Sequence, residues 1–278
     1  MNEDVTKEWA EKRYRHPFFG ECFSREKISE IWDRSAKSYD DGPLGPVQNM
    51  VIEEMRSSGI LMSGFSIIDI GCGPGTYSFR FAELVEEVVC LDGSREMLNR
   101  LESKCLETKT SNIEYIHSDW TVYESARRFD VVFSSLCPPL NCPEQILRME
   151  GLSRRFCVYI SSMNDDAGSV HMEIWKALGR DYTFNGYNTE YPYRFLISKG
   201  RAPVLKVFET SSPSEKSVED VVRFEMEKFS AYMDTDNGTE RIIKDVVEAH
   251  AEDGVVHYDG RKKLGLLIWA PLQHKRPD

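Results

Sequence analysis

The stretch Ile67-Ile68-Asp69-Ile70-Gly71-Cys72-Gly73-Pro74-Gly75-Thr76 decides how the chain is expected to fold. Apolar residues around a single acid are typical of a buried strand, and three glycines at alternate positions predict a tight turn. A helix-like run follows from Tyr77 to Leu84. Strand, glycine turn and helix in this order form the first unit of an open α/β sheet, in which ligands bind at the carboxyl ends of the strands.

The spacing and charge of this stretch separate two kinds of nucleotide ligand. A dinucleotide fingerprint places its third glycine three positions after the second, whereas here Gly75 follows Gly73 by two positions and Thr76 holds the expected place. The carboxylate of Asp69, two residues before the first glycine, would face the loop and repel a pyrophosphate. A ligand with positive charge and no phosphate fits better, and S-adenosylmethionine has both an ammonium and a sulfonium group.

Length and composition indicate an ordinary globular chain. With 278 residues, 41% hydrophobic and 29% charged, it is long enough for one large core with appended segments. The formal net charge of -11 argues against general nucleic-acid binding, which requires clustered Lys and Arg. The sequence leaves the oligomeric state open.

No signal for a membrane or for export is found in the sequence. No apolar run approaches the ~20 residues of a membrane span, and the chain opens on acidic, polar residues. The seven cysteines are an odd number without a C-x-x-C pair, so we expect reduced thiols, no metal site and a cytoplasmic location.

The order of the expected elements predicts a doubly wound, Rossmann-like α/β fold with a seven-stranded, mostly parallel sheet. Residues 1–58 are expected to form an N-terminal helical cap. Its first helix is capped by Ser24, has an apolar face through Tyr39 and ends at Asp41-Gly42-Pro43, and its second spans 47–58. The pair either covers the carboxyl edge of the sheet or plugs its core. Residues 59–278 form the main domain, with C-terminal helical lid insertions at about 162–200 and 210–255. The expected strands are 66–70, 87–91, 113–117, 129–134, 156–161, 204–208 and 264–269; the helices between them are 94–106, 170–178, 217–233 and 239–250.

Three acids follow successive strands of the expected sheet. Asp69, Asp92 and Asp119 stand at or just beyond strand carboxyl ends, which form one rim in a doubly wound sheet. One such acid means little, because loops are rich in Asp. Three in succession beside a glycine loop predict one ligand crevice.

Over residues 30–160 the chain resembles the class I S-adenosylmethionine-dependent methyltransferases, in particular their small-molecule branch. The motifs that carry the resemblance are Asp69-x-Gly71-x-Gly73-x-Gly75, Leu91-Asp92-x-Ser94-x-x-Met97-Leu98, Ser118-Asp119-Trp120, Phe129 to Leu136 and the leader Ser35 to Asp40, which ends in Tyr-Asp. The resemblance implies a seven-stranded sheet with an antiparallel last strand, and S-adenosylmethionine as cofactor.

The resemblance also implies a role for each matched residue. Asp69 would hold the cofactor's ammonium group, Asp92 its ribose hydroxyls and Asp119 its adenine amino group. The other implied cofactor-site residues are the glycine-loop residues Gly71, Cys72, Gly73 and Gly75, then Gly93, Ser94, Met97, Ser118 and Trp120, then Ser135 and Leu136 on the methyl-transfer side, and Tyr39 over the methionine end. Within the loop, Gly71 and Gly73 would let the backbone approach the cofactor, and Gly75 would allow close packing where the helix starts. Read singly, Trp120, Met97 and Tyr39 are more typical of core packing.

Cys137-Pro138-Pro139-Leu140 differs from the Asn/Asp-Pro-Pro-aromatic motif of methyltransferases that act on nucleobases or glutamine. The first position lacks the carbonyl acceptor and the fourth lacks the aromatic ring. We therefore interpret the prolines as a rigid turn and expect a different acceptor.

The expected activity is transfer of a methyl group to a small-molecule acceptor by in-line displacement. Much of the acceleration can come from holding the acceptor and the methyl group at attack distance, and a general base is required only if the acceptor must lose a proton. Candidate general bases are His117, His171, Tyr182 and Tyr191, and none is singled out as catalytic. The aromatic segment 182–195 and the helices from 217 to 250 either enclose the acceptor or form a core of their own. Two alternatives stay open: a protein or RNA methyltransferase, and a non-catalytic S-adenosylmethionine-binding module.

Overall fold

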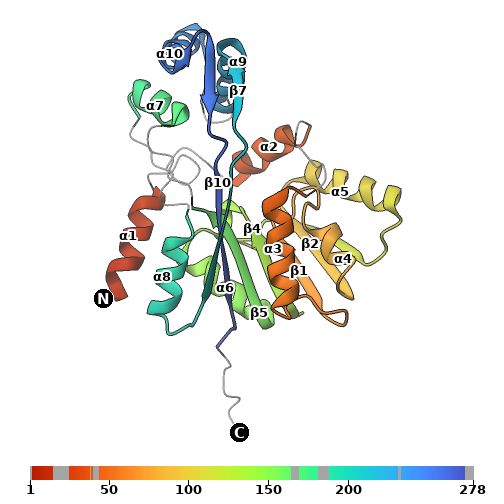
Figure 1. Cartoon of the computed structure of the whole chain (residues 1–278). Coiled ribbons are helices and arrows are strands. Elements are labelled where there is room, and N and C mark those ends of the chain that lie inside the picture. Colours follow the sequence, from red (N-terminus) through yellow and green to blue (C-terminus); the bar gives the residue numbers. More distant parts are fainter. Residues whose placement is uncertain are drawn as a thin grey trace.

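The structure of the chain is a computed structural model that describes residues 2–14, 25–37, 39, 44–163, 169–180, 188–230 and 233–272. Its centre is a seven-stranded sheet in the order β3-β2-β1-β4-β5-β10-β6 (Figure 1). The strands are β1 (Ser66–Ile70), β2 (Glu87–Asp92), β3 (Ile113–His117), β4 (Phe129–Ser135), β5 (Ser153–Ser162), β6 (Val204–Thr210) and β10 (Lys262–Trp269).

Only β10 runs against its neighbours in this sheet. It pairs antiparallel with β5 and β6, whereas β1 pairs parallel with β2 and β4 in direct register, Ile68 opposite Val89 and Val132. The strand order reverses between β1 and β4, so their carboxyl ends flank a topological switch point. The predicted doubly wound, mostly parallel α/β sheet is confirmed.

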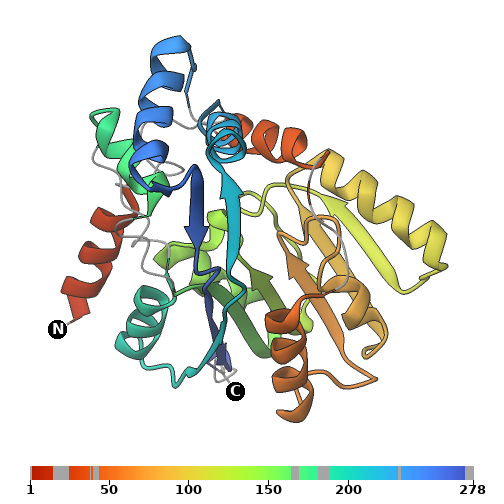
Figure 2. The same ribbon diagram turned by 45° about the horizontal axis from the view of Figure 1, so that its top comes forward.

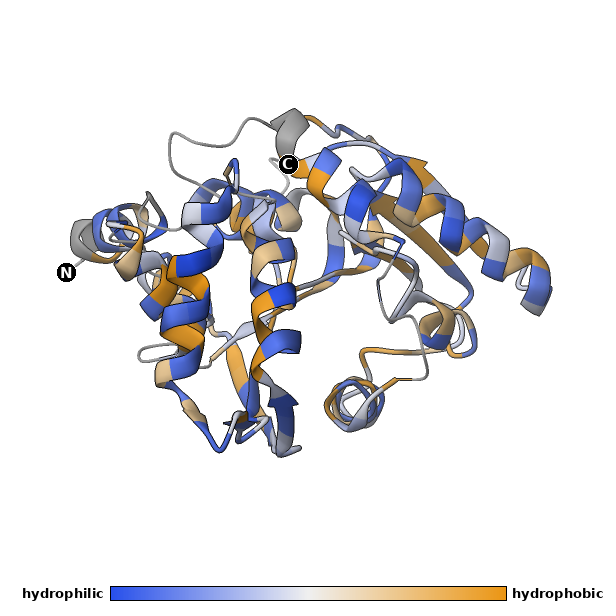
Figure 3. Cartoon of the chain, turned by 90° about the horizontal axis from the view of Figure 1, so that it is seen from above, coloured by the Kyte–Doolittle hydropathy of each residue, from blue (hydrophilic) through white to orange (hydrophobic). Residues whose placement is uncertain are grey.

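The central strands are apolar on both sides because helices cover both faces of the sheet. Ile67 of β1 belongs to a core with α3 (Pro46–Ser57), α4 (Ser78–Ala82) and α5 (Arg95–Thr108). Its neighbour Ile68 points to the opposite face, into a core with α1 (Asn2–Tyr14), α6 (Pro143–Leu152) and α8 (Glu190–Ser198). Viewed from above, the helices are part hydrophobic and part hydrophilic along their length (Figure 3), which suits elements with one packed and one solvated side.

The two expected N-terminal helices behave differently. Helix α2 (Arg25–Ser35) contacts α5 near the carboxyl edge of the sheet. Helix α3 packs on the sheet face and contacts β6, with Val51 and Met55 fully buried. A further helix, α1, was not expected; it lies beside α8 (Figures 1 and 2), and Trp9 stacks on Tyr191 with ring centroids 6.5 Å apart.

A second, smaller module stands beyond the carboxyl edge of the sheet (Figure 1). The chain contributes α7 (Val170–Ala177) after β5, enters the module again from β6 and returns through β10. The other elements of the module are α9 (Val218–Ser230), α10 (Asn237–Ala249) and a sheet of β7 (Ser214–Ser217), β9 (Val255–Tyr258) and β8 (Ala251–Glu252). Its own core includes Trp175, Phe229 and Val247. The helices were expected, but the small sheet was not.

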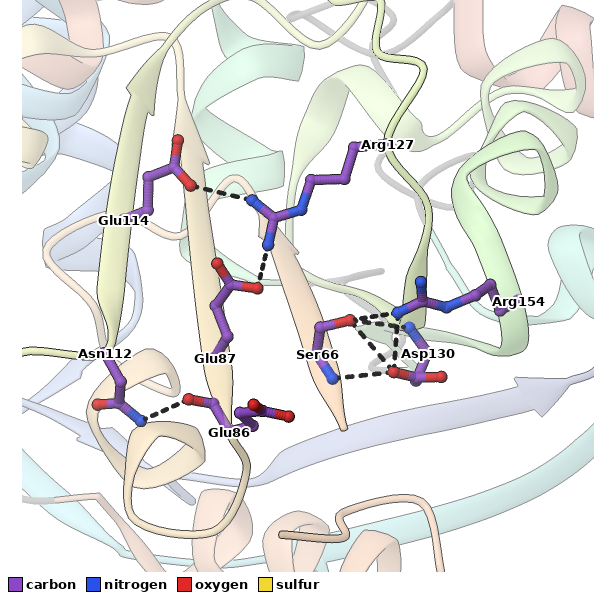
Figure 4. A network of polar contacts seen from close by, with 8 residues as sticks. All are labelled: Ser66, Glu86, Glu87, Asn112, Glu114, Arg127, Asp130 and Arg154. Atoms are coloured by element: carbon purple, nitrogen blue, oxygen red, sulfur yellow. Dashed lines mark hydrogen bonds and ion pairs between the residues drawn. The ribbon is translucent and has the colours of Figure 1, made fainter. Parts of the chain in front are cut away.

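Polar contacts at the opposite, amino edge tie the strands together (Figure 4). Asp130 accepts hydrogen bonds from the Ser66 backbone N–H at 3.0 Å and from Arg154 at 3.0 Å. Arg127 bridges Glu87 of β2 and Glu114 of β3. These contacts lie at the edge of the sheet opposite the switch point. Substitutions there therefore serve as controls for effects on stability alone.

Candidate active site

A pocket of about 570 Å³ lies at the carboxyl ends of β1, β2 and β4. It brings together every predicted site residue except Gly75: Tyr39, Asp69, Gly71, Cys72, Gly73, Asp92, Gly93, Ser94, Met97, Ser118, Asp119, Trp120, Ser135 and Leu136. Its volume lies within the range of about 300–1,000 Å³ that is usual for small-molecule sites.

The glycine loop needs its glycines for two different reasons. All three have positive φ, of +72° at Gly71, +55° at Gly73 and +88° at Gly75, a conformation that other residues rarely adopt. A Cβ on Gly71 would lie 2.5 Å from the Sγ of Cys137, so the loop can approach the end of β4 only without a side chain. At Gly73 no atom lies within 4 Å of a Cβ position, so the space beside it is open.

Gly75 was expected among the cofactor-site residues as the glycine that allows close packing where the helix starts, and the structure places it outside the pocket lining. A Cβ there would lie 2.7 Å from the Phe79 ring and 3.2 Å from Leu101. The glycine therefore allows close packing between the loop and the helices α4 and α5.

Asp69 is only 3% exposed, and its Oδ2 accepts a hydrogen bond of 2.6 Å from the hydroxyl of Ser78. Burial raises the pKa of Asp69 to about 7, against the lowering effect of the Ser78 bond. The nearby Asp92 carboxylate raises that pKa further. A buried carboxyl of this kind is poised to ionise when a cation arrives.

The carboxylate of Asp92 joins two loops. Its Oδ2 accepts from the Gly73 N–H and its Oδ1 from the Ser94 N–H, both at 2.8 Å. Burial raises the pKa of Asp92, while these two backbone bonds oppose the rise. Each oxygen has a second lone pair available for a ligand in the pocket.

Ser94 caps the N-terminus of α5, where its hydroxyl accepts from the Met97 N–H at 3.2 Å. The same hydroxyl donates to Asp33 of α2 at 2.5 Å, and Asp33 also accepts from the Glu96 N–H. The cap thus fastens α2 to the rim on the side of the pocket that Met97 lines.

The loop after β3 is stabilised by a hydrogen bond within the loop and by contacts with Arg148 of α6. Asp119 Oδ1 accepts from the N–H of Thr121 at 2.6 Å, and this bond closes a tight turn. Arg148 of α6 lies 4.8 Å above the Trp120 ring and donates to the carbonyls of Trp120, Thr121 and Tyr123 at 3.0, 3.0 and 2.7 Å. Trp120 is 3% exposed, belongs to the sheet core and also lines the pocket.

The end of β4 holds a strained residue. Leu136 has φ +50° and is 45% exposed, an unusual state for a branched apolar side chain, and its N–H donates to Ile160 O at 2.9 Å. Cys137, Pro138 and Pro139 follow and also line the pocket. The predicted rigid turn is a short 3-10 helix, η1 (Pro138–Leu140).

Comparisons with known proteins agree with this geometry. Residues 67–150 match the model of a methyltransferase domain family. Residues 67–150 thus form a class I S-adenosylmethionine-dependent methyltransferase domain. Cypemycin N-terminal methyltransferase from Streptomyces sp is 36% identical over 108 residues, 38% of this chain and 42% of that protein. (S)-coclaurine N-methyltransferase from Papaver somniferum is 32% identical over 76 residues, 27% of this chain and 22% of that protein.

The magnesium protoporphyrin IX methyltransferase of Synechocystis PCC 6803, solved with bound S-adenosylhomocysteine, has the same fold. The TM-score is 0.53 at 15% identity, over 87% of this chain and 96% of that one. The chain spans less than half the length of the two curated relatives above. Their likeness therefore concerns only part of this chain.

The sequence did not point to several residues that complete the methyltransferase pocket. Arg13 of α1 and Ile28, Ser29 and Trp32 of α2 reach it from the N-terminal helices, and Cys142, Gln145 and Leu264 from the segments around α6 and β10. The apolar face expected for α2 included Ile28 and Trp32. Whether that face points toward a ligand depends on how α2 packs in the folded protein. The described residues contain no group of three His, Cys, Asp or Glu side chains placed to hold a metal ion.

Three of the four candidate bases lie among the described residues, and none of these three lines the pocket. His117 contacts Arg95 and the carbonyl of Gly93. His171 binds Glu225 inside the small module. Tyr191 packs on Trp9. Tyr182 lies outside the described residues.

Most described aromatic residues of the two insertions belong to cores, whereas Phe224 of α9 is 46% exposed. Tyr191 and Phe195 of α8 pack on Trp9, and Trp175 packs on Phe229, so they do not enclose the pocket. Phe184 and Tyr187 lie outside the described residues. Among the described residues, no helix has the length and apolar character required to cross a membrane.

Proposed function

We propose that this chain transfers a methyl group from S-adenosylmethionine to a small-molecule acceptor bound in the pocket at the end of β4. The observation that carries the proposal is the convergence of Asp69, Asp92 and Asp119 beside the open cradle at Gly73. A lining with three acids suits a cationic nucleoside and disfavours a pyrophosphate.

The residues present fit this cofactor. Asp69 would hold the ammonium group, Asp92 the ribose hydroxyls and Asp119 the adenine amino group. The backbone can approach closely at Gly73, since no atom occupies the position of a Cβ there. When bound, the cofactor supplies an electrophilic methyl on a sulfonium.

The protein contributes position rather than proton transfer. Leu136, Pro138 and Pro139 present a rigid, apolar wall from which an acceptor can meet the methyl group. Burial raises the pKa values of Tyr77, Cys137 and Cys142. These groups keep their protons at neutral pH, so they orient an acceptor as hydrogen-bond donors.

A small acceptor is favoured by the size of the pocket and by the relatives. The coclaurine and magnesium protoporphyrin IX enzymes are named for small molecules. A screen of metabolites with methyl-labelled S-adenosylmethionine tests the proposal. Label in a small molecule supports it, whereas label only in added protein or RNA, or cofactor binding with no transfer, would favour one of the alternatives.

A further inference from the structure

The pocket has two ends of opposite charge. Three carboxylates line the end formed by β1, β2 and the loop after β3, whereas Arg13 is the single basic side chain among the described residues that line the pocket. Burial lowers the pKa of Arg13, and the nearby Cys142, Glu144 and Tyr159, on the N-cap of α6, on α6 and on β5, oppose that change. Arg13 therefore faces the side of η1 and α6, away from the expected cofactor site.

Helix α1 holds Arg13 in this place. Trp9, one turn earlier on the same helix face, is fully buried between Tyr191 and Phe195 of α8. Glu8 forms an ion pair of 3.0 Å with Arg194 of α8. These two contacts fix α1 on α8. The position of α1 in turn determines where the Arg13 side chain reaches the pocket.

The surroundings of Arg13 raise the energy of its positive charge. Desolvation lowers the pKa of Arg13, and the pocket lining also includes the apolar side chains of Leu136, Pro138 and Pro139. A guanidinium with little water around it gains most from an anionic oxygen pair, which it binds in a two-pronged geometry. The Glu144 carboxyl is a competing anion within the protein.

We infer that the methyl acceptor carries an anionic group, a carboxylate or a phosphate, and that Arg13 binds it at the end of the pocket opposite the three acids. This inference rests on the proposed function and narrows its substrate class. Arg13 acts as a specificity-determining residue that binds the acceptor, whereas the three carboxylates bind the cofactor.

Binding of simple probes to the protein saturated with S-adenosylhomocysteine tests the inference without a known substrate. Benzoate and phenyl phosphate represent the two anionic groups, and benzamide is the neutral match to benzoate. We expect at least one anion to bind more tightly than benzamide, seen as a larger rise in melting temperature. Arg13→Gln should weaken the binding of that anion by about tenfold or more, and Arg13→Lys by less.

Two further variants make the result specific. Glu144→Gln should tighten anion binding, because it removes the competing carboxylate. Lys7→Gln removes a positive charge from an exposed site of the same helix and should change nothing. The inference is wrong if benzamide binds as well as the better-binding anion, or if Arg13→Gln and wild type bind that anion equally. Failure of wild type to bind S-adenosylhomocysteine would instead contradict the proposed function.

Discussion

The carboxylate of Asp92 accepts a hydrogen bond from the backbone N–H of Gly73 at 2.8 Å. The bond joins the end of β2 to the glycine loop after β1, two segments that the sequence separates by 19 positions. The residue expected to bind ribose hydroxyls is thus also the one that shapes the loop. Loss of this carboxylate should disturb both functions together.

Asp92→Asn should lower the affinity for S-adenosylmethionine by about tenfold to a hundredfold, because an amide N–H₂ replaces one acceptor oxygen and faces a backbone donor. Isothermal calorimetry measures the change. The matched control is Asp130→Asn, the same substitution at the amino edge, where Arg154 and Ser66 lose a partner. It should lower stability by about 1–3 kcal/mol and leave cofactor affinity unchanged; equal affinity losses in both variants would contradict the assignment.

Gly71→Ala should reduce stability and cofactor affinity, since the new Cβ would lie 2.5 Å from Cys137 Sγ at a backbone φ of +72°. Adding Cys137→Ala should recover part of the stability, because it removes the Sγ contact. The Cβ of residue 137 stays 2.8 Å from the new Cβ, and the backbone strain of about 1–2 kcal/mol also remains. Urea unfolding of the two single variants and the double variant gives the coupling. Strict additivity would show that the contact does not constrain the loop.

Arg148→Met should weaken cofactor binding although Arg148 does not line the pocket. Its guanidinium holds three carbonyls of the loop that carries Asp119 and Trp120. Arg154→Met removes an arginine of comparable bonding from the opposite edge (Figure 4). Hydrogen exchange should rise at the amides of 119–123 in Arg148→Met only, together with the dissociation constant. Unchanged exchange there would argue against a positioning role.

Cofactor affinity should depend on pH through Asp69. Its pKa is raised to about 7 by burial, so the folded protein keeps a proton that the unfolded chain loses above about pH 4. The stability contributed by this carboxyl is therefore greatest below about pH 4 and falls as pH rises to 7. A cationic ligand favours the ionised form, so affinity should rise with pH up to about 7 and then level off.

Calorimetry at about pH 6 in buffers of different ionisation enthalpy measures the coupled proton. Binding should release up to one proton there and almost none at about pH 8. Asp69→Asn should abolish the release. Proton uptake, or the same release in Asp69→Asn, would show that another group titrates.

The strands were the most predictable part of the fold. Those at 66–70 and 113–117 agree at both ends with β1 and β3, because a central strand buried on both faces is a continuous apolar run and an edge strand is β-branched and aromatic. β5 begins at Ser153, three residues before the predicted start, since its first residues are polar and gain their place only by pairing with β4.

Elements without a continuous apolar pattern escaped prediction. Helix α1 buries Val5 and Trp9 but is otherwise polar, and α8 contains Pro192 near its start. Pro143 at the first position of α6 is a helix-start signal that could have been used. The small sheet depends on the β7 segment Ser214–Ser217, which has no β-forming residues and is a strand only through its partner β9.

The residues of the site also fall into a predictable and an unpredictable group. The glycines and the three acids follow strand ends, so topology alone brings them together. Arg13, Trp32 and Gln145 reach the pocket from helices that are distant in sequence, and only packing determines where their side chains lie. The acid-lined end of the pocket was therefore predictable, and the helical side of the pocket was not.

The central claim is that the acid-lined pocket binds a cationic nucleoside and not a diphosphate. Calorimetric titration of the wild-type protein with S-adenosylmethionine, S-adenosylhomocysteine and NAD tests it most directly. We predict saturable binding of both sulfur compounds with one site per chain and no detectable heat with NAD. Saturable binding of NAD, with neither sulfur compound bound, would contradict the account.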